Sequence, residues 1–207
     1  MKVSKILAAL LFVALVIGFS ATAFSGNHSE GHAHDGEASG EKYQLDPVHS
    51  SAVFRIKHLD VGYVFGMFRE VDGSFTFDEA NPAASEFSFS MNTASVFTNH
   101  QQRDDHLRSP DFFAAEEHPE MTFQSTSVEE THPGTYRIRG DFTLRGVTQE
   151  IEVIADKTGE GQGMRGEERI GFNTTFAVNR MTHGVDFMPD GLGEHVRVMF
   201  SIQGIKQ

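Results

Sequence analysis

The chain has no cysteine, no tryptophan, only three tyrosines and six prolines, and far fewer basic than acidic residues. Without cysteine there is neither a disulfide nor a nucleophilic thiol, so the fold must be held together by its core alone. The 17 Lys and Arg against 29 Asp and Glu give a net charge of −12 at pH 7. Nucleic acid is not an expected partner, because binding to its backbone depends on basic side chains that neutralise phosphates.

Phenylalanine is abundant where the other aromatic residues are scarce. The 207 residues include 19 Phe, and this length suits one sizeable domain. A phenylalanine buries a large apolar area and carries no polar group that needs a partner. The composition therefore predicts a strongly apolar interior.

The first 23 residues have the pattern of a cleaved signal peptide. Lys2 and Lys5 precede an apolar run over residues 6–19, and small residues follow at 21–23. The run is short for a membrane span and has no charged stop-transfer segment behind it. We predict export with cleavage near Phe24 and no transmembrane span in the mature form.

Residues 24–41 are rich in Gly, Ser, His and acids, which predicts a disordered linker before a domain over residues 42–207. His28, His32 and His34 could capture a divalent metal weakly, since imidazole is a ligand for Zn, Cu and Ni. Their spacing matches no closed metal site. A solvated spacer is the alternative interpretation.

From Tyr43 onwards, apolar residues alternate with polar ones, for example over residues 52–58, 71–78 and 87–92. Alternation with period 2 predicts strands with one apolar face, and turn residues separate at least eight such runs. A sandwich and a barrel both accept such strands. Hairpin-like connections and the need to remove exposed edges favour an all-β, extended antiparallel up-and-down barrel.

Residues 103–113 break the alternation, because charges and apolar residues cluster there. Ser109 offers an N-cap hydroxyl, Pro110 suits the first helical position, and Asp111 suits the positive end of a helix. These signals predict that one short helical cap begins at Ser109 and closes the barrel.

Three segments carry a resemblance to a known family: His49 to Phe68, residues 103–113 with 119–123, and residues 140–148. Together they resemble the YceI-like family of bacterial periplasmic proteins, over residues 43–205. The resemblance implies an elongated, lipocalin-like antiparallel barrel that holds a polyisoprenoid or another long-chain lipid, and a periplasmic location. A bound lipid is then the expected ligand, no cofactor is expected, and a homodimer remains open.

The chain departs from the family's motifs in two places. Where members commonly read Arg-x-Asp-Phe-Gly, this chain has Thr182 and His183 after Arg180. Phe142 occupies the first position of the usual Leu-Thr-x-x-Gly.

The resemblance and the alternation together predict which residues bind the lipid. The same apolar faces are also compatible with a barrel that is solidly filled by side chains. The expected lipid-binding interior residues are Phe54, Ile56, His58, Phe65, Phe68, Phe75, Phe77, Phe87, Phe89, Met91, Phe142, Leu144, Phe172, Phe176, Val198 and Phe200. The expected residues of the cap and mouth are Arg103, Asp105, His106, Leu107, Arg108, Phe112, Phe113 and Arg180.

The sequence offers weaker signals for two other function classes, catalysis and metal binding. Catalysis has acid–base candidates but no nucleophile motif such as Gly-x-Ser-x-Gly and no metal-ligand spacing inside the domain, so no enzyme is expected. A metal- or stress-related binder would work through the histidines of the linker. The acid–base candidates are Asp104, Asp105, His106, His49, His58 and His183.

Overall fold

The structure is a computed structural model that describes residues 40–207. The predicted signal peptide, residues 24–39 of the predicted linker and its three histidines lie outside the described residues. The strands are β1 (Glu41–Leu45), β2 (Ser51–His58), β3 (Gly62–Phe68), β4 (Val71–Phe77), β5 (Glu86–Asn92), β6 (Val96–Phe97), β7 (Glu120–His132), β8 (Thr135–Leu144), β9 (Val147–Gln162), β10 (Glu168–Asn179) and β11 (His195–Lys206). The helices are α1 (Gln101–Arg108) and the 3₁₀ turns η1 (Pro82–Ala84), η2 (Thr93–Ser95) and η3 (Arg180–His183).

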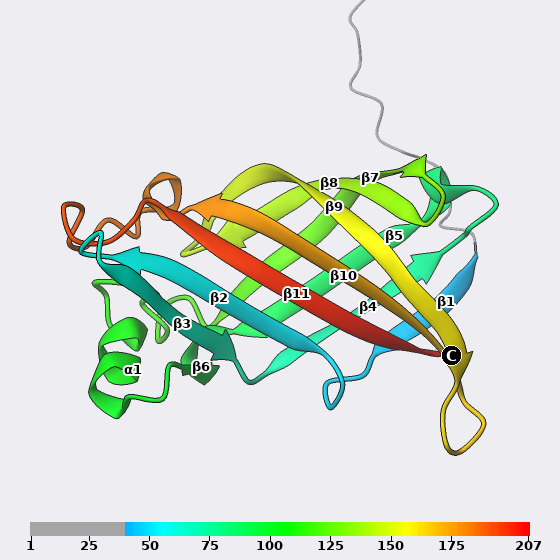
Figure 1. Ribbon diagram of the computed structural model, residues 1–207, viewed down its shortest axis with the longest axis horizontal. Helices are drawn as coiled ribbons and strands as arrows, with labels where there is room; N and C mark the ends of the chain where they lie inside the picture. The colour runs from blue at the N-terminus through cyan, green and yellow to red at the C-terminus, as the bar shows by residue number, and fades with distance from the viewer. Residues whose placement is uncertain (1–39) are drawn as a thin grey trace, which may run out of the picture. The chain divides into compact units, whose positions relative to one another are not determined.

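The strands form a closed antiparallel barrel of eight strands, in the ring order β1-β4-β5-β7-β8-β9-β10-β11 with β11 returning to β1 (Figure 1). The remaining three strands continue the sheet outward from one member of this ring, β11. β2 pairs with β11 beyond the segment that pairs with β1, β3 pairs with β2, and β6 pairs with β3. Strands that follow one another in the chain are neighbours from β7 to β11 and for β4 with β5, as in an up-and-down barrel, whereas β1 pairs with β4 and β11, and β5 pairs with β7. The predicted fold class is confirmed.

Alternation fixes which residues face inward. In β5, Phe87, Phe89 and Met91 are buried while Ser88 between them is exposed. Glycine makes room for a ring on the inner face where β2 and β3 pair. Gly66 lies opposite Phe54 in the β2–β3 ladder, and a Cβ at Gly66 would collide with the Phe54 ring. Such close approach requires a residue without a side chain.

One end of the barrel interior is filled by a cluster of aromatic rings, which we call the aromatic floor: Tyr43, Phe75, Phe77, Phe87, Tyr136 and Phe172. The Phe75 ring stacks between those of Tyr43 and Phe87, with centroids at 5.1 and 5.3 Å. The Phe172 ring meets Phe77 edge-on at 5.1 Å. All six side chains are at most 8% exposed. This end of the barrel is a solid core.

Helix α1 lies at the opposite end of the barrel, and the sequence signals predicted it at the wrong residues. The helix runs from Gln101 to Arg108, with His100 as its N-cap, so the prediction that it begins at Ser109 is wrong. Ser109 is instead its C-cap, and Pro110 follows directly. Proline is as typical just after a helix as at its first position, and the local sequence cannot separate the two. Within residues 40–207, no helix combines the length and hydropathy needed to cross a bilayer.

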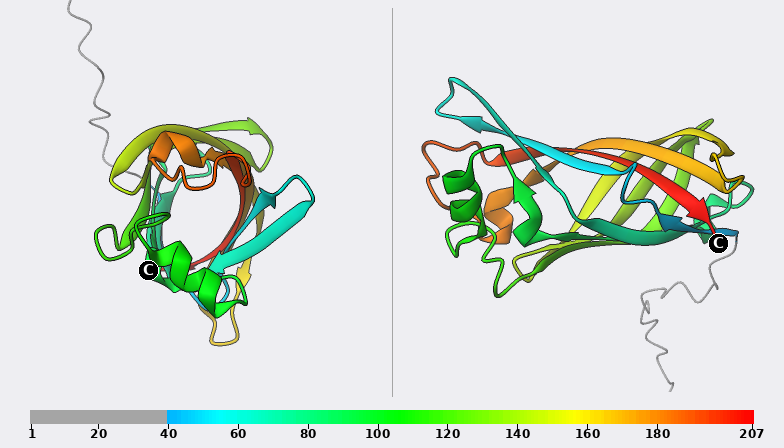
Figure 2. Two further views of the ribbon diagram at one scale, coloured as in Figure 1. Left: turned by 90° about the vertical axis from the view of Figure 1, so that its left-hand side faces the viewer. Right: turned by 90° about the horizontal axis from the view of Figure 1, so that it is seen from below.

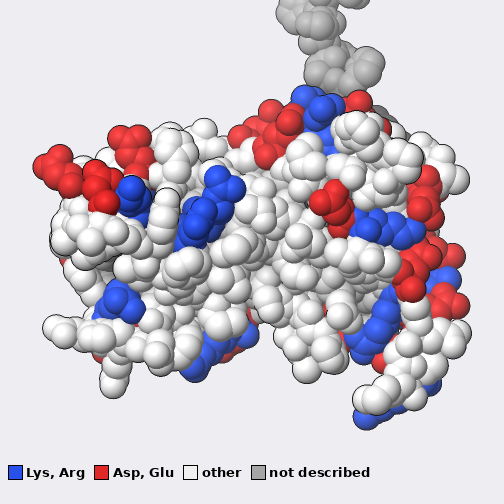
Figure 3. All heavy atoms as spheres, viewed as in Figure 1, with Lys and Arg blue, Asp and Glu red and all other residues white. Residues whose placement is uncertain are grey.

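Ion pairs tie the strand ends together beside the aromatic floor, and on the face in Figure 3 acidic and basic side chains lie in small mixed clusters. The most buried carboxylate among these pairs is Asp46, which accepts from Arg169 Nη1 at 2.6 Å and lies 2.7 Å from His49 Nδ1. Burial alone would raise the pKa of Asp46. The hydrogen bonds from Arg169 and then His49 outweigh burial and hold this pKa well below its usual range.

A substitution at Asp46 should therefore have a pH-dependent cost. Because the pKa is depressed in the folded state, the stabilisation is fully present above the unfolded value of about 4 and is lost as pH falls through the folded value. We expect Asp46→Asn to lower the free energy of unfolding by about 1–3 kcal/mol at pH 7, and by progressively less below about pH 4. Urea denaturation at several pH values measures this, and a loss independent of pH would contradict the ionic origin.

The aromatic floor should be the most costly part of the interior to truncate. Phe75→Ala removes a ring packed on all sides, so we expect a loss of about 3–5 kcal/mol. The matched control is Phe68→Ala near α1, where the ring packs against Phe54 and Phe113 and its surroundings are less filled. We expect a clearly smaller loss there in lipid-free protein. Equal losses in urea denaturation would show that both ends are packed alike.

A candidate lipid-binding cavity at the helix end of the barrel

The half of the barrel nearest α1 is hollow. A cavity of about 410 Å³, here called the outer chamber, lies between the inner faces of the strands, α1 and the segment 185–192 that follows η3. The end view in Figure 2 shows α1 and the segment around η3 at the same end of the barrel. Phe187 and Met188 line the chamber and are also 38% and 39% exposed, so the chamber reaches the surface beside them.

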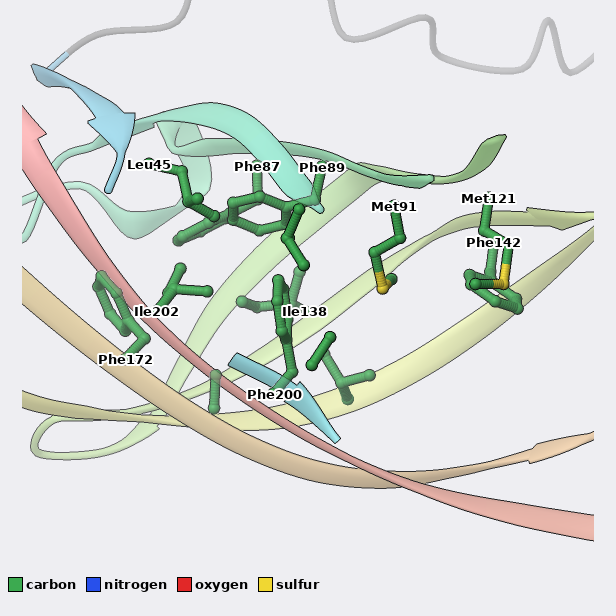
Figure 4. Close-up of a cluster of buried hydrophobic side chains, with 14 of the residues drawn as sticks. Leu45, Phe87, Phe89, Met91, Met121, Ile138, Phe142, Phe172, Phe200 and Ile202 are labelled. Atoms are coloured by element: carbon green, nitrogen blue, oxygen red, sulfur yellow. The ribbon is translucent and has the colours of Figure 1, made fainter. Parts of the chain in front are cut away.

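A second space of about 50 Å³, the inner chamber, lies deeper in the barrel, toward the aromatic floor. Its wall is almost wholly apolar and includes Phe87, Phe89 and Phe200. Phe89 and Phe200 meet edge-on across it at 5.3 Å. Figure 4 shows Phe87, Phe89, Phe172 and Phe200 grouped together, with Met91 set apart from them on the side of Met121 and Phe142.

The structure brings most predicted residues to these two chambers. The predicted residues that line the outer chamber are Phe54, Ile56, His58, Phe68, Met91, Phe142, Leu144, Phe176, Val198, Arg103, His106, Leu107, Phe112, Phe113 and Arg180. The inner chamber is lined by Phe87, Phe89, Phe172 and Phe200, and again by Met91, Phe142 and Phe176. Phe75 and Phe77 line neither chamber and are packed in the aromatic floor.

Three predicted site residues lie elsewhere. Phe65 is 53% exposed on the outer face of β3, because Gly66 and Phe68 occupy the inner face and side chains alternate. Its assignment to the interior is wrong. Asp105 and Arg108 are absent from both chamber walls and pair with each other at 2.8 Å. Arg108 also donates to the carbonyls of Ala94 and Val96, so it fastens α1 to the neighbouring strand.

Arg180 is the most deeply buried charge in the wall of the outer chamber, at 2% exposed. Its guanidinium makes no ion pair with a carboxylate among the described residues. It donates instead to the backbone carbonyls of Val185, Phe187, Leu192 and Gly193, at 2.5–3.1 Å. Burial lowers the pKa of Arg180, and Asp186 and Glu194 oppose that effect. Arg180 therefore holds the segment over the mouth in place and leaves a positive charge at the chamber wall.

The other ionisable groups of the wall are basic as well. They are Arg103, His106 and His58, and no Asp or Glu belongs to the wall of the outer chamber as the described residues form it. Arg103 donates from Nε and Nη2 to Oγ1 and the carbonyl of Thr98, at 2.7 and 2.8 Å. In a chain with net charge −12, a wall that contains arginines and no acids is suited to an anionic group.

Sequence reasoning missed the wall residues that come from the segment 185–192. Val185, Phe187, Met188 and Leu192 all line the outer chamber. The segment has no period-2 pattern that would assign them to an inner face. Its placement depends on Arg180 and on backbone bonds to the β2–β3 hairpin, where Leu59 N donates to Gly191 O at 2.7 Å and Gly193 N to Lys57 O at 2.9 Å.

The acid–base candidates do not form a common catalytic group. Asp104 is buried and accepts from the backbone N–H and the hydroxyl of Thr98. His106 Nε2 lies 2.8 Å from Asp111 Oδ2, and His183 Nδ1 lies 3.0 Å from the carbonyl of Val147. Asp104, His106 and His183 thus each have a structural partner, whereas His58 lines the outer chamber. Within residues 40–207, no three His, Asp or Glu side chains converge as a metal site would require.

The comparisons agree with this architecture. A family model of the YceI-like domain matches residues 43–204. A UPF0312 protein of Ectopseudomonas mendocina is 41% identical over 174 residues, which are 83% of this chain and 91% of that protein. A UPF0312 protein of Pseudomonas aeruginosa is 37% identical over the same shares of both chains.

Solved structures show the same fold. The Campylobacter jejuni YCEI protein has a TM-score of 0.65 at 28% identity, covering 73% of this chain and 90% of that one. A polyisoprenoid binding domain from Saccharophagus degradans has a TM-score of 0.62 at 15% identity, covering 80% and 98%. BcnA of Burkholderia cenocepacia reaches 0.70 at 19% identity, covering 77% and 98%. By sequence over nearly the whole described barrel, and by fold, this chain belongs to the YceI-like family.

Proposed function

We propose that the protein is a periplasmic carrier that holds one long-chain lipid, of the polyisoprenoid or acyl type, in its outer chamber. The observation that carries the proposal is a cavity of about 410 Å³ with an apolar wall and a partly exposed rim, closed below by packed aromatic rings. Small-molecule sites in proteins are typically about 300–1,000 Å³, mostly apolar, with a few polar groups that orient the ligand. The polyisoprenoid-binding relative supports the choice of ligand class.

The apolar wall supplies the driving force. Each methylene moved from water into the chamber contributes up to about 0.8 kcal/mol before ordering costs are subtracted. Polar groups lie at the end of the chamber near α1, where Arg103, His106 and Arg180 belong to its wall. The proposed pose therefore places the hydrocarbon in the barrel and the polar head between α1 and the segment 185–192.

We infer that the protein binds its ligand without transforming it. Asp104, His106 and His183 are each held by a structural partner, and they do not converge on a common group. The predicted export signal supports a periplasmic location, which N-terminal sequencing of the protein from the periplasmic fraction tests. A chain that still carried Lys2 and Lys5 in the membrane fraction would contradict it.

Native mass spectrometry of the purified protein, followed by organic extraction, tests the carrier function directly. We expect a bound amphiphile, and we expect lipid added to stripped protein to raise the melting temperature. A ligand at a hundred times its Kd stabilises by about 2.7 kcal/mol, which corresponds to roughly 5–10 °C for a domain of this size. Val198→Trp, which places a large ring in the chamber and reduces the space for lipid, should weaken the shift.

The matched control is Ser127→Trp on the exposed face of β7, which should leave the shift unchanged. The proposed carrier function is wrong if the unsubstituted, folded protein releases no amphiphile and no added prenyl or acyl lipid changes its melting temperature.

The basic wall predicts a preference for an anionic head. We expect a prenyl phosphate or a long-chain carboxylate to bind more tightly than the alcohol of the same chain, by about 1–2 kcal/mol, because charge-assisted hydrogen bonds are the stronger ones. Arg103→Gln should reduce this difference, whereas Arg139→Gln on the outer face of β8 should not. Isothermal titration with the three ligands measures it, and equal affinities for all three heads would contradict the prediction.

A further inference from the structure

Three side chains belong to the walls of both chambers: Met91 from β5, Phe142 from β8 and Phe176 from β10. β8 is separated from β5 by β7 and from β10 by β9 in the ring. The three residues therefore approach the interior from different parts of the barrel wall. They mark the level at which the interior narrows from about 410 Å³ above to about 50 Å³ below.

The three side chains differ in how firmly they are held. The Phe142 ring packs edge-on against the His183 ring at 5.4 Å, and His183 is itself fixed by the Val147 carbonyl. Phe142 is thus a rigid side of the narrowing. Met91 has a flexible thioether chain, and Phe176 is only partly buried. These two can change rotamer at lower cost.

Volume sets the length of chain that the outer chamber holds. A carbon-sized group takes about 30 Å³, the share of a water molecule in the liquid. On that measure the outer chamber holds roughly fourteen such groups and the inner chamber fewer than two. Below the inner chamber the rings of Phe87 and Phe172, with centroids at 5.6 Å, belong to the solid aromatic floor.

We propose that Met91, Phe142 and Phe176 form a constriction that sets the length of the lipid chain this protein accepts. This inference rests on the proposed carrier function. The preferred ligand is an amphiphile whose hydrocarbon has about fourteen carbon groups, close to a farnesyl chain. Carbons beyond that number must displace the constriction or remain outside the mouth.

The energetics give the expected length profile. Each additional methylene that enters the outer chamber tightens binding by about fourfold, at roughly 0.8 kcal/mol. The gain stops when the tip of the chain reaches the constriction. Affinity should therefore rise with length up to roughly fourteen carbons and then level off or fall.

The absence of tryptophan from the chain permits a direct test of depth. Phe89→Trp places a single indole in the wall of the inner chamber, where it reports on contact with a bromine atom by quenching. The probes are saturated carboxylic acids of increasing length that carry bromine on the terminal carbon. In Phe89→Trp protein we expect binding, measured by the melting shift, and little quenching even by the longest acid.

Opening the constriction should let the chain tip through. In Phe89→Trp/Phe176→Ala we expect strong quenching by the longer acids, and a preference for the longer acids that rises at least about tenfold. The control Phe89→Trp/Phe112→Ala removes the same atoms from the outer chamber only and should stay unquenched. Phe176→Leu and a reporter at Phe200→Trp serve where an alanine variant or the first reporter fails to fold.

The outcomes separate this inference from the proposed function. If no acid of any length shifts the melting temperature of the unsubstituted protein, the carrier function is wrong. If the acids bind and already quench Phe89→Trp in a barrel with an intact constriction, or if Phe176→Ala and Phe112→Ala behave alike, the constriction does not set chain length.

Discussion

The packing of the Phe172 ring is the contact on which the barrel depends. This ring comes from β10 and meets Phe75 and Phe77 of β4, Phe87 of β5 and Tyr136 of β8, with centroids between 5.1 and 6.1 Å. These strands lie on different sides of the closed ring. Backbone pairing joins only neighbouring strands, so a shared ring cluster is what fixes opposite walls relative to each other. In a chain without disulfides, no covalent link can replace it.

The contacts in the solidly packed end stabilise the fold enough to offset the contacts that are absent in the hollow end. An unfilled apolar space forfeits the dispersion contacts that its wall would otherwise make. The aromatic floor concentrates those contacts near β1 and the start of β10, where the pairs of Asp46 with Arg169 and Lys206 with Glu168 also join strand ends. The fold therefore depends less on dispersion contacts at the helix end. Its wall can therefore face a ligand, and α1 with the segment 185–192 can form a mouth.

Features that neighbouring residues in the sequence encode could be predicted, whereas features that depend on contacts between distant strands could not. Period-2 alternation is local, so the strands, their inner faces and the closed fold class were predicted correctly. A helix signal around Ser109 was present but ambiguous, since proline follows helices as readily as it begins them. Phe65 was assigned to the interior because it matches a family motif. It lies three positions before Phe68, so the alternation places the two residues on opposite faces of the strand. Whether a given phenylalanine packs in the floor, like Phe75, or lines a chamber, like Phe54, depends on rings from distant strands that no local pattern encodes.

The contacts at the mouth were also not predictable from sequence, and they show what surrounds Arg180 where the chain departs from the family's motif at Thr182. The family's usual motif has an aspartate two residues after the arginine, at the position that Thr182 occupies in this chain. Here Thr182 is an exposed residue whose hydroxyl donates to the carbonyl of Asn179, and backbone carbonyls satisfy Arg180 instead. Carbonyls are dipoles and carry no net charge, so they meet the hydrogen-bonding needs of the guanidinium without cancelling its charge. A buried cation is costly to leave uncompensated. Asp186 and Glu194 act on Arg180 through space without a hydrogen bond to it, and under the proposed function an anionic head at the mouth would add to their effect.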